Sequence, residues 1–407
     1  PMNRLLQGDV GSGKTVVALT SLLAAIGSGY QAALMAPTEI LAQQHYLRMK
    51  EFLSSLNVQP FLLISELQQK EKERIKNEIK GGTVKLVIGT HALIQKEVQF
   101  HKLGIVVIDE QHRFGVMQRA TLRSKGKCPD VLVMTATPIP RTLALTCYGD
   151  LDVSVIDELP PGRKSVITRW ISENKRRWVY QFVSSQIKEG RQAYFVYPLI
   201  EESEEINLRA AEDMVGRLRK DIFPQFKVEL LHGRMRREEK EFVMKHFSQG
   251  NIDIMVCTTV IEVGIDVPNA TIMVIENAER FGMAQLHQLR GRVGRGGAQS
   301  YCFLLTGNKI SEEAVKRMKV MCKTNDGFQI AEEDLKLRGP GQFFGTRQWG
   351  ELDLKIANLL RDQRMLNLAR REAFNLVRED PLLYNHPLLK KAIKMRFPYQ
   401  WELAKVG

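Results

Sequence analysis

The residues with the clearest chemical potential lie at the start of the chain, in the segment from Gly8 to Thr15. It reads Gly-Asp-Val-Gly-Ser-Gly-Lys-Thr, fits the pattern GxxxxGK[ST], and stands between an apolar run and a helical stretch. Glycines let backbone N–H groups turn towards a phosphate, and the following helix N-terminus adds positive potential. We predict that Lys14 reaches the β and γ phosphates of a nucleoside triphosphate and that Thr15 holds Mg²⁺. The predicted nucleotide-binding residues are Gly8, Gly11, Ser12, Gly13, Lys14 and Thr15.

Two carboxylates follow the apolar run 105–108. Strands of open α/β sheets present functional groups at their carboxyl ends, beside a phosphate loop. We therefore predict that Asp109 is a metal ligand, and that Glu110 orients and deprotonates an attacking water. The alternative is that the pair is only a solvated strand end.

The segment 285–296 reads Gln-Leu-His-Gln-Leu-Arg-Gly-Arg-Val-Gly-Arg-Gly. Nothing in core packing calls for three arginines interleaved with glycines, so this segment is a second candidate for chemistry. We predict that Arg292 and Arg295 cross a cleft and neutralise charge on the transferring phosphoryl group, a role worth about 10³–10⁵ in rate. Gln288 belongs to the same predicted catalytic set. The alternative is a nucleic-acid-binding arginine loop without a catalytic role.

The elements that must position these groups come in two successive sets. Most apolar runs are nearly continuous Val, Ile, Leu and Met, which is typical of strands buried on both faces in mostly parallel sheets covered by helices. The first set has predicted strands at 3–7, 31–36, 85–88, 105–108 and 131–134, with helices at 14–26, 39–53 and 67–79. The second set has predicted strands at 193–196, 227–231, 254–257, 271–275 and 300–305.

The same pattern divides the chain into domains. Two prolines and a glycine interrupt regular structure between the two sets. The predicted α/β architecture is a nucleotide-binding lobe at 1–157, a linker at 158–164, a second lobe at 165–310, a helical hairpin with a following loop at 311–350, and a helical tail at 351–407.

Small hydroxyl and basic residues follow several predicted strands in both lobes. Each alone is more typical of a turn or a helix cap, but together they would line one edge of each sheet. Hydroxyls and backbone N–H groups at such an edge suit contacts with nucleic-acid phosphates, which position a chain without reading its sequence. The candidates are Thr38, Thr90, Thr137, His232, Arg234 and Thr258. Gly264 and Asp266 are further candidates for the nucleotide, with Asp266 near the ribose.

Composition narrows the class of protein. The chain has 59 Lys and Arg against 46 Asp and Glu, a net charge of +13 that favours a polyanionic partner. With 44% hydrophobic and 26% charged residues it is neither disordered nor collagen-like.

The five cysteines form no CxxC pair, which argues against a zinc site or a disulfide framework and suits a reducing compartment. No run of 18 apolar residues suggests a membrane span, and we predict no signal peptide.

Together these segments resemble the superfamily-two helicases, whose motor is a pair of tandem RecA-like lobes. The similarity extends from Gly8 to about Gly350. The segment 334–350 reads Asp-Leu-Lys-Leu-Arg-Gly-Pro-Gly-Gln-Phe-Phe-Gly-Thr-Arg-Gln-Trp-Gly, and its LRGPG and FGTRQ parts are similar to those of the RecG family. In that family a helical hairpin followed by this translocation motif couples nucleotide state to movement on duplex DNA. The resemblance assigns this coupling role to Arg338, Arg347 and Gln348.

Resemblance to the RecG family implies an ATP-dependent DNA helicase that hydrolyses ATP with Mg²⁺ and works as a monomer in the bacterial cytoplasm. Its partners would be double-stranded and branched DNA. It would drive branch migration of Holliday junctions and regression of stalled replication forks in recombination and DNA repair. In that family an N-terminal wedge domain with an OB-fold splits the strands, and a glutamine-containing segment of related helicases contacts adenine. Because the phosphate loop stands so near Pro1, we expect both to lie upstream in a longer protein.

Three alternatives remain at this point. A transcription-repair coupling translocase related to Mfd shares the hairpin motif, although that family usually reads RGAG and GEEQ there. An RNA helicase of the DEAD-box type typically has Asp-Glu-Ala-Asp and Ser-Ala-Thr, where this chain has Asp-Glu-Gln-His and Thr-Ala-Thr. A non-catalytic DNA-binding or docking module has no use for Lys14, Glu110 and Arg292 together.

Overall fold

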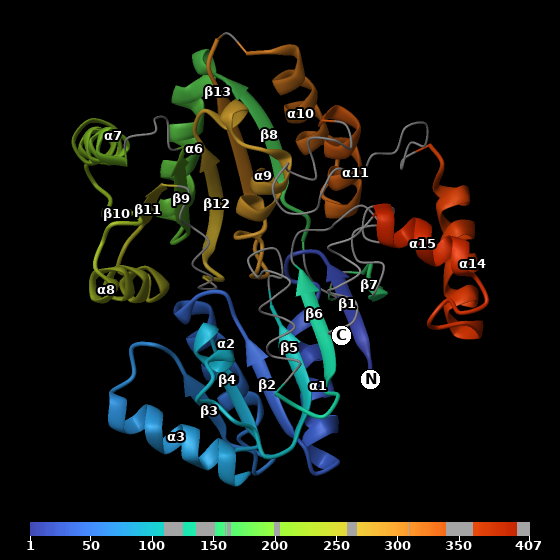
Figure 1. The fold of residues 1–407 in the computed structure, drawn as a ribbon. Helices are drawn as coiled ribbons and strands as arrows, with labels where there is room; N and C mark the ends of the chain where they lie inside the picture. Colours follow the sequence, from blue (N-terminus) through green and yellow to red (C-terminus); the bar gives the residue numbers. More distant parts are fainter. Residues whose placement is uncertain are drawn as a thin grey trace.

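Two α/β lobes lie one above the other, and a helical region lies beside them (Figure 1). The computed structural model describes residues 1–109, 125–135, 151–158, 160, 164–198, 204–258, 267–308, 310–338 and 361–396. Within these residues, no helix is both long and apolar enough to cross a membrane.

The first lobe is built on a seven-stranded sheet in which neighbouring strands are parallel. Its strands are β1 (Asn3–Gly8), β2 (Gln31–Met35), β3 (Pro60–Leu63), β4 (Leu86–Gly89), β5 (Leu103–Ile108), β6 (Asp130–Thr135) and β7 (Asp152–Ile156). They lie in the order β3-β4-β2-β5-β6-β1-β7. The interior strand β2 is buried along its whole length, as its continuous apolar run predicts.

Helices cover both faces of this sheet. They are α1 (Lys14–Gly27), α2 (Glu39–Phe52), α3 (Gln69–Gly81) and the short turn η1 (His91–Ile94). Successive residues of a strand point to opposite faces, so Leu5 of β1 packs in one hydrophobic cluster with Ile75 of α3, and Leu6 packs in another with Leu22 of α1. The first lobe therefore has an apolar layer on each side of its sheet, and its functional groups must lie at the strand ends.

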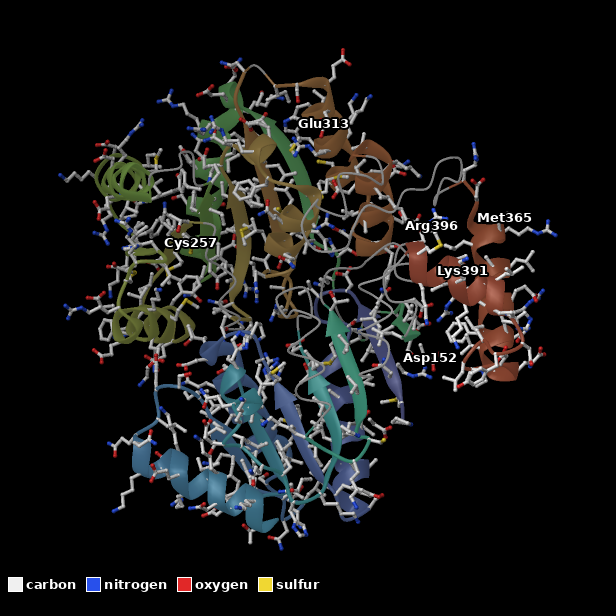
Figure 2. All side chains as sticks on the ribbon, in the orientation of Figure 1. Asp152, Cys257, Glu313, Met365, Lys391 and Arg396 are labelled. Atoms are coloured by element: carbon white, nitrogen blue, oxygen red, sulfur yellow. The ribbon has the colours of Figure 1, made fainter. Side chains whose placement is uncertain are left out.

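The second lobe repeats this plan with six strands and the order β10-β11-β9-β12-β13-β8, again with parallel pairings. Its strands are β8 (Ile167–Ser172), β9 (Gln192–Tyr197), β10 (Val228–Leu231), β11 (Ile254–Thr258), β12 (Ala270–Ile275) and β13 (Tyr301–Thr306). Its helices are α6 (Arg176–Lys188), α7 (Glu204–Arg217), α8 (Arg237–Ser248) and α9 (Met283–Arg290), with the short turns η3 (Glu173–Lys175), η4 (Leu218–Ile222) and η5 (Ala278–Arg280). Cys257 of β11 lies among the side chains that fill this lobe (Figure 2).

The C-terminal region is helical, as predicted. It contains α10 (Glu312–Lys323), α11 (Gly327–Arg338), α14 (Gln363–Glu379) and α15 (Pro387–Arg396). The side chain of Ser311 caps α10 by accepting a hydrogen bond from the Ala314 N–H at 3.2 Å. Helix α10 packs against β8, and α11 packs against α9, so this helical pair is attached to the second lobe. Helices α14 and α15 stand out from the lobes, and Met365 on α14 is 65% exposed (Figure 2).

All ten predicted strands are present, within about two residues at each end. Three further strands, β3, β7 and β8, were not predicted, and each lies at the edge of its sheet. The chain passes from the first sheet to the second between Ile156 and Ile167. The predicted linker 158–164 falls in this interval, and the domain bounds stay predictions.

Candidate active site

The phosphate loop connects the end of β1 to the start of α1. Its backbone has positive φ at Gly11 (75°) and Gly13 (96°), which side-chain-bearing residues rarely adopt. Gly8 has a different reason to be glycine, because a Cβ there would lie 2.4 Å from the Ser12 Oγ and would displace this hydroxyl. The spacing of glycines in the sequence is therefore explained by the tightness of this turn.

The loop is built to receive negative charge. Lys14 is only 9% exposed, and its ammonium donates hydrogen bonds to the carbonyl oxygens of Gly8 (2.9 Å) and Asp9 (2.8 Å). Among the described residues no side chain caps the N-terminus of α1, its first turn has no acidic residue, and the buried Ser12 Oγ has no hydrogen-bond partner. An uncapped helix N-terminus, an unpartnered hydroxyl and an ammonium fit the phosphates of a nucleotide.

The predicted metal ligand Asp109 follows β5 directly. Its N–H donates to the Met35 carbonyl at 2.9 Å, and its Oδ2 lies 2.8 Å from the Nε2 of His45 on α2. Sequence reasoning missed His45, because a histidine on a helix carries no signal of its own. Helix α1, which begins with Lys14 and Thr15, packs against β5. The described residues contain no cluster of three His, Cys, Asp or Glu that could bind a metal by itself. Mg²⁺ at Thr15 and Asp109 would therefore need oxygen ligands from phosphate.

The second lobe meets the phosphate loop through the end of α9. The Nε2 of His287 lies 2.5 Å from the Oδ1 of Asp9. A Cβ on Gly291 would lie 2.9 Å from the Cβ of Val10, so the Gly291 backbone is in close contact with the loop. The segment of glycines and arginines therefore faces the loop that holds Lys14.

The carboxylate of Asp9 is kept ionised at this contact. Burial raises the pKa of Asp9, but the hydrogen bond from His287 and those from the N–H groups of Val10 (2.6 Å) and Gly327 (3.2 Å) lower this pKa by more than burial raises it. The net effect is a pKa below the ordinary value for aspartate. Asp9 is thus a fixed negative charge beside the phosphate loop, a feature that the motif alone does not reveal.

One of the three arginines is a core residue, which corrects the prediction that packing calls for none of them. Arg290 is 2% exposed, and its guanidinium donates to the carbonyl oxygens of Met321 and Thr324 at 2.9 Å each and to the Thr168 Oγ1 at 3.3 Å. Burial lowers the pKa of Arg290, and these bonds compensate for the desolvation of its charge. Arg290 therefore joins α9 to α10 and β8.

The other predicted residues of this segment are half-buried. Arg295 donates from Nε to the Gly291 carbonyl at 3.2 Å, and the Arg292 N–H donates to the Leu289 carbonyl at 3.0 Å. Gln288 lies one residue after His287 on α9. Their catalytic roles stay predictions.

The candidates for nucleic-acid contact follow the carboxyl ends of parallel strands, as expected. The Thr38 hydroxyl caps α2 by accepting from the Leu41 N–H at 3.4 Å. Thr90 and Thr258 are buried, whereas Arg234 is exposed and His232 is half-buried, with a pKa lowered by burial. Among the described candidates, Arg234 is thus the exposed one, and Thr38 and His232 are half-buried.

Several predicted residues lie outside the described part of the chain. They are Glu110, Thr137, Gly264, Asp266, Arg347 and Gln348, together with the side chain of Arg338.

Three family models match successive parts of the chain. The DEAD/DEAH box helicase family matches residues 2–146, and the helicase conserved C-terminal domain matches residues 174–297. The third, ATP-dependent DNA helicase RecG, domain 3, C-terminal, matches residues 324–394.

Individual relatives agree with these matches. The ATP-dependent DNA helicase RecG of Thermotoga maritima is 56% identical over 372 residues, which cover 91% of this chain and 48% of that protein. RecG of Bacillus subtilis is 53% identical over 380 residues, covering 93% of this chain and 55% of that protein. A solved structure of RecG bound to a three-way DNA junction is 52% identical with a TM-score of 0.73, over 90% of this chain and 47% of that chain.

More distant structures share the fold alone. Dbp5 of Saccharomyces cerevisiae bound to RNA and ADP BeF3 is 18% identical, with a TM-score of 0.57 over 91% of this chain and 89% of that chain. The two α/β lobes, with a phosphate loop in the first facing a segment of glycines and arginines in the second, have the fold of the superfamily-two helicases. The chain belongs to the RecG helicase family. It spans about half the length of the curated relatives that it matches.

Proposed function

We propose that this chain is the ATP-driven motor of a bacterial cytoplasmic DNA helicase. It translocates on double-stranded DNA, drives branch migration of Holliday junctions and regresses stalled replication forks in recombination and repair. The observation that carries the proposal is the contact of α9 and Gly291 with the phosphate loop. A motor needs the two lobes to meet at the nucleotide, because hydrolysis then changes how they are held together.

Each residue of the site has a proposed role in that cycle. The loop residues Gly8, Gly11, Ser12 and Gly13 and the start of α1 hold the phosphates, and Lys14 neutralises their charge. Thr15 and Asp109 hold Mg²⁺, which organises the phosphate oxygens. Glu110 positions and deprotonates the attacking water. The residues that act on the transferring phosphoryl group are Gln288, Arg292 and Arg295. Gly264 and Asp266 contact the nucleotide.

The proposed DNA contacts lie on strand ends and after α11. The basic surplus of the sequence supports gripping of the phosphate backbone, an interaction that does not depend on base sequence. Thr38, Thr90, Thr137, His232, Arg234 and Thr258 would contact this backbone, and Arg338, Arg347 and Gln348 would couple the contact to hydrolysis. Junction specificity would come from a wedge domain in the full-length protein.

The comparisons favour this function over its alternatives. The three matched families end in a domain particular to RecG, and relatives at 51–56% identity carry the RecG name. The Mfd-like alternative gains no support from them, and the likeness to RNA-bound helicases is confined to the fold.

The central test is ATP turnover by the full-length protein and by this chain on duplex, single-stranded and forked DNA and on RNA. We expect duplex and forked DNA to stimulate turnover most. Lys14→Ala should abolish turnover, because it removes the phosphate clamp. Glu110→Gln should bind ATP and DNA but turn over at least about 10²-fold more slowly. Arg48→Ala, a change on the outer part of α2, is the matched control.

Two results would contradict the proposal. Turnover by Lys14→Ala near the parent rate would remove Lys14 from the site. Equal stimulation by RNA and duplex DNA would reject the assignment of double-stranded DNA as the track.

A further inference from the structure

A single residue of the phosphate loop contacts Lys14, the second lobe and the helical pair α10–α11 at the same time. Its carbonyl oxygen accepts from the Lys14 ammonium at 2.8 Å. Its carboxylate accepts from His287 of α9 at 2.5 Å and from the N–H of Gly327, the first residue of α11, at 3.2 Å. This residue is Asp9, which occupies a variable position of the GxxxxGK[ST] pattern.

The direction of the bonds fixes the protonation of His287. A guanidinium has only donors, so in the 2.9 Å contact between Arg290 and His287 the imidazole Nδ1 must accept. In the tautomer that satisfies this contact, the ring proton sits on Nε2, where it is donated to Asp9. Because His287 is 5% exposed, water cannot readily replace either partner. Arg290 thus donates a hydrogen bond to His287, and His287 donates one to Asp9.

The two ends of this series of hydrogen bonds, Arg290 and Asp9, hold the turn between α10 and α11. Arg290 donates to the carbonyls of Met321 and Thr324, which end α10. Asp9 holds the start of α11 through Gly327. The turn is therefore fixed from two sides, one belonging to each lobe.

A nucleotide in the loop would act on both functions of Asp9. Phosphate oxygens attract the Lys14 ammonium, which in this structure is bonded to the carbonyls of Gly8 and Asp9. They also bring negative charge close to the Asp9 carboxylate, and like charges in a partly buried site repel strongly. The empty and occupied loops therefore differ in how well Asp9 can hold His287 and Gly327. A difference of this kind is what coupling between two sites requires.

We propose that Asp9 and His287 are positioning residues that transmit the occupancy of the phosphate loop to the α10–α11 pair. The inference rests on the proposed function in that it takes the loop to bind a nucleoside triphosphate. It goes beyond that function by naming the contact through which the loop acts on the helices.

The first test follows the turn directly by amide hydrogen exchange of the segment 321–330 in the full-length protein. The probe is the non-hydrolysable analogue AMP-PNP with Mg²⁺. In the parent protein we expect AMP-PNP to change the amide exchange rate of this segment by about 10-fold, which is the effect of one charge-assisted hydrogen bond. Asp9→Asn, which is isosteric, should bind AMP-PNP within about 3-fold of the parent and lose this response. A response that survives in Asp9→Asn overturns the proposal.

The second test is a double-mutant cycle on duplex-stimulated ATP turnover. Asp9→Asn and His287→Ala should each lower the stimulated kcat by about 10-fold with little change in the KM for ATP. The double variant should be no slower than the slower single variant, because both changes break one contact. His287→Gln, whose amide can donate to Asp9, should recover part of the loss. His246→Gln, at a half-buried histidine of α8 that takes no part in this contact, is the matched control.

The outcomes separate the two proposals. A parent protein without duplex-stimulated turnover rejects the proposed function, and the exchange experiment still decides the role of Asp9. Multiplicative losses in the double variant, or a raised KM with unchanged stimulation, reject the link between Asp9 and His287. If thermal melting shows that His287→Ala does not fold, His287→Gln takes its place in the cycle. The expected loss of kcat is then smaller, and it must again be non-additive with the loss caused by Asp9→Asn.

Discussion

The arginines at the end of α9 show that one residue type serves different purposes within six positions. Arg290 is buried and bonded to two carbonyls, a hydroxyl and an imidazole. Arg292 and Arg295 are half-buried near the phosphate loop. The first arginine is therefore structural, and the other two are the candidates for catalysis. A pair of matched substitutions can separate these roles.

Arg290→Met should destabilise the protein, because it leaves the buried carbonyls of Met321 and Thr324 without donors. Each lost bond of this kind costs roughly 1–3 kcal/mol, so we expect a total loss of about 2–4 kcal/mol in the free energy of unfolding. Thermal denaturation should show a midpoint lower by roughly 5–10 °C. Arg292→Met should change the midpoint little but lower ATP turnover by about 10³-fold or more.

The opposite pattern would contradict these assignments. If Arg290→Met kept the parent midpoint while Arg292→Met lowered it, then Arg292 would be the structural residue. The comparison needs no knowledge of the DNA substrate, because melting and ATP turnover are both measured on the same preparations.

At the scale of single residues, the sequence predicted which residues could do chemistry better than it predicted which residues contact one another. Lys14 and the loop glycines follow from the motif, because each has one physical reason to be there. His45 and His287 were not singled out, since a histidine on a helix is recognisable only when its partner is known. Their partners, Asp109 and Asp9, are 64 and 278 residues away along the chain. Arg290 was grouped with its neighbours because burial cannot be read from a pattern of Gly and Arg.

At the scale of elements, strands buried on both faces were the easiest to predict, although the edge strand β10, which has the same burial pattern as β3, was predicted as well. Central strands such as β2 and β12 are buried on both faces and appear as continuous apolar runs. The unpredicted strands β3, β7 and β8 are edge strands with partly exposed residues, so their apolar pattern is weaker. The first residue of β3 is Pro60, which has no N–H to donate and is tolerated at an edge.

The junction between α9 and the phosphate loop depends on the absence of a side chain at Gly291. Gly291→Ala would place a Cβ 2.9 Å from the Cβ of Val10, so the lobes must separate slightly. Overpacking of this kind costs about 1–3 kcal/mol, and we expect kcat/KM for ATP to fall by roughly 10-fold or more. Steady-state kinetics on duplex DNA provide the measurement.

A second change tests whether this contact is the cause. Val10→Gly removes the Cβ and the methyl groups that the new side chain would meet. In the double variant, kcat/KM should therefore recover to near the value of Val10→Gly alone. No recovery would mean that Gly291 acts through something other than its contact with Val10.

At the scale of the whole molecule, each sheet has its own hydrophobic clusters, and the coupling that we propose would occur where the two lobes meet. The described contacts there include those of Asp9 with His287 and Gly327, and of Val10 with Gly291. Under the proposed coupling, a change at the phosphate loop would act through these contacts on a helical pair anchored on the second lobe. The sequence predicted this architecture through its repeated strand pattern and through its resemblance to RecG, but it did not predict the contacts between the halves.

The motif after α11 should then convert that movement into translocation. Arg347→Ala or Gln348→Ala in the full-length protein should leave duplex-stimulated ATP turnover within about 3-fold of the parent, because the nucleotide site and its anchors are untouched. Junction unwinding per ATP hydrolysed should fall by about 10-fold or more, because the helical pair still moves but no longer carries the DNA contact with it. Parallel assays of ATP hydrolysis and of strand displacement on a synthetic Holliday junction give this ratio. Unwinding that stays proportional to ATP consumed would show that the coupling contact lies elsewhere, and the anchors of the α10–α11 turn at Arg290 and Asp9 would be the next positions to test.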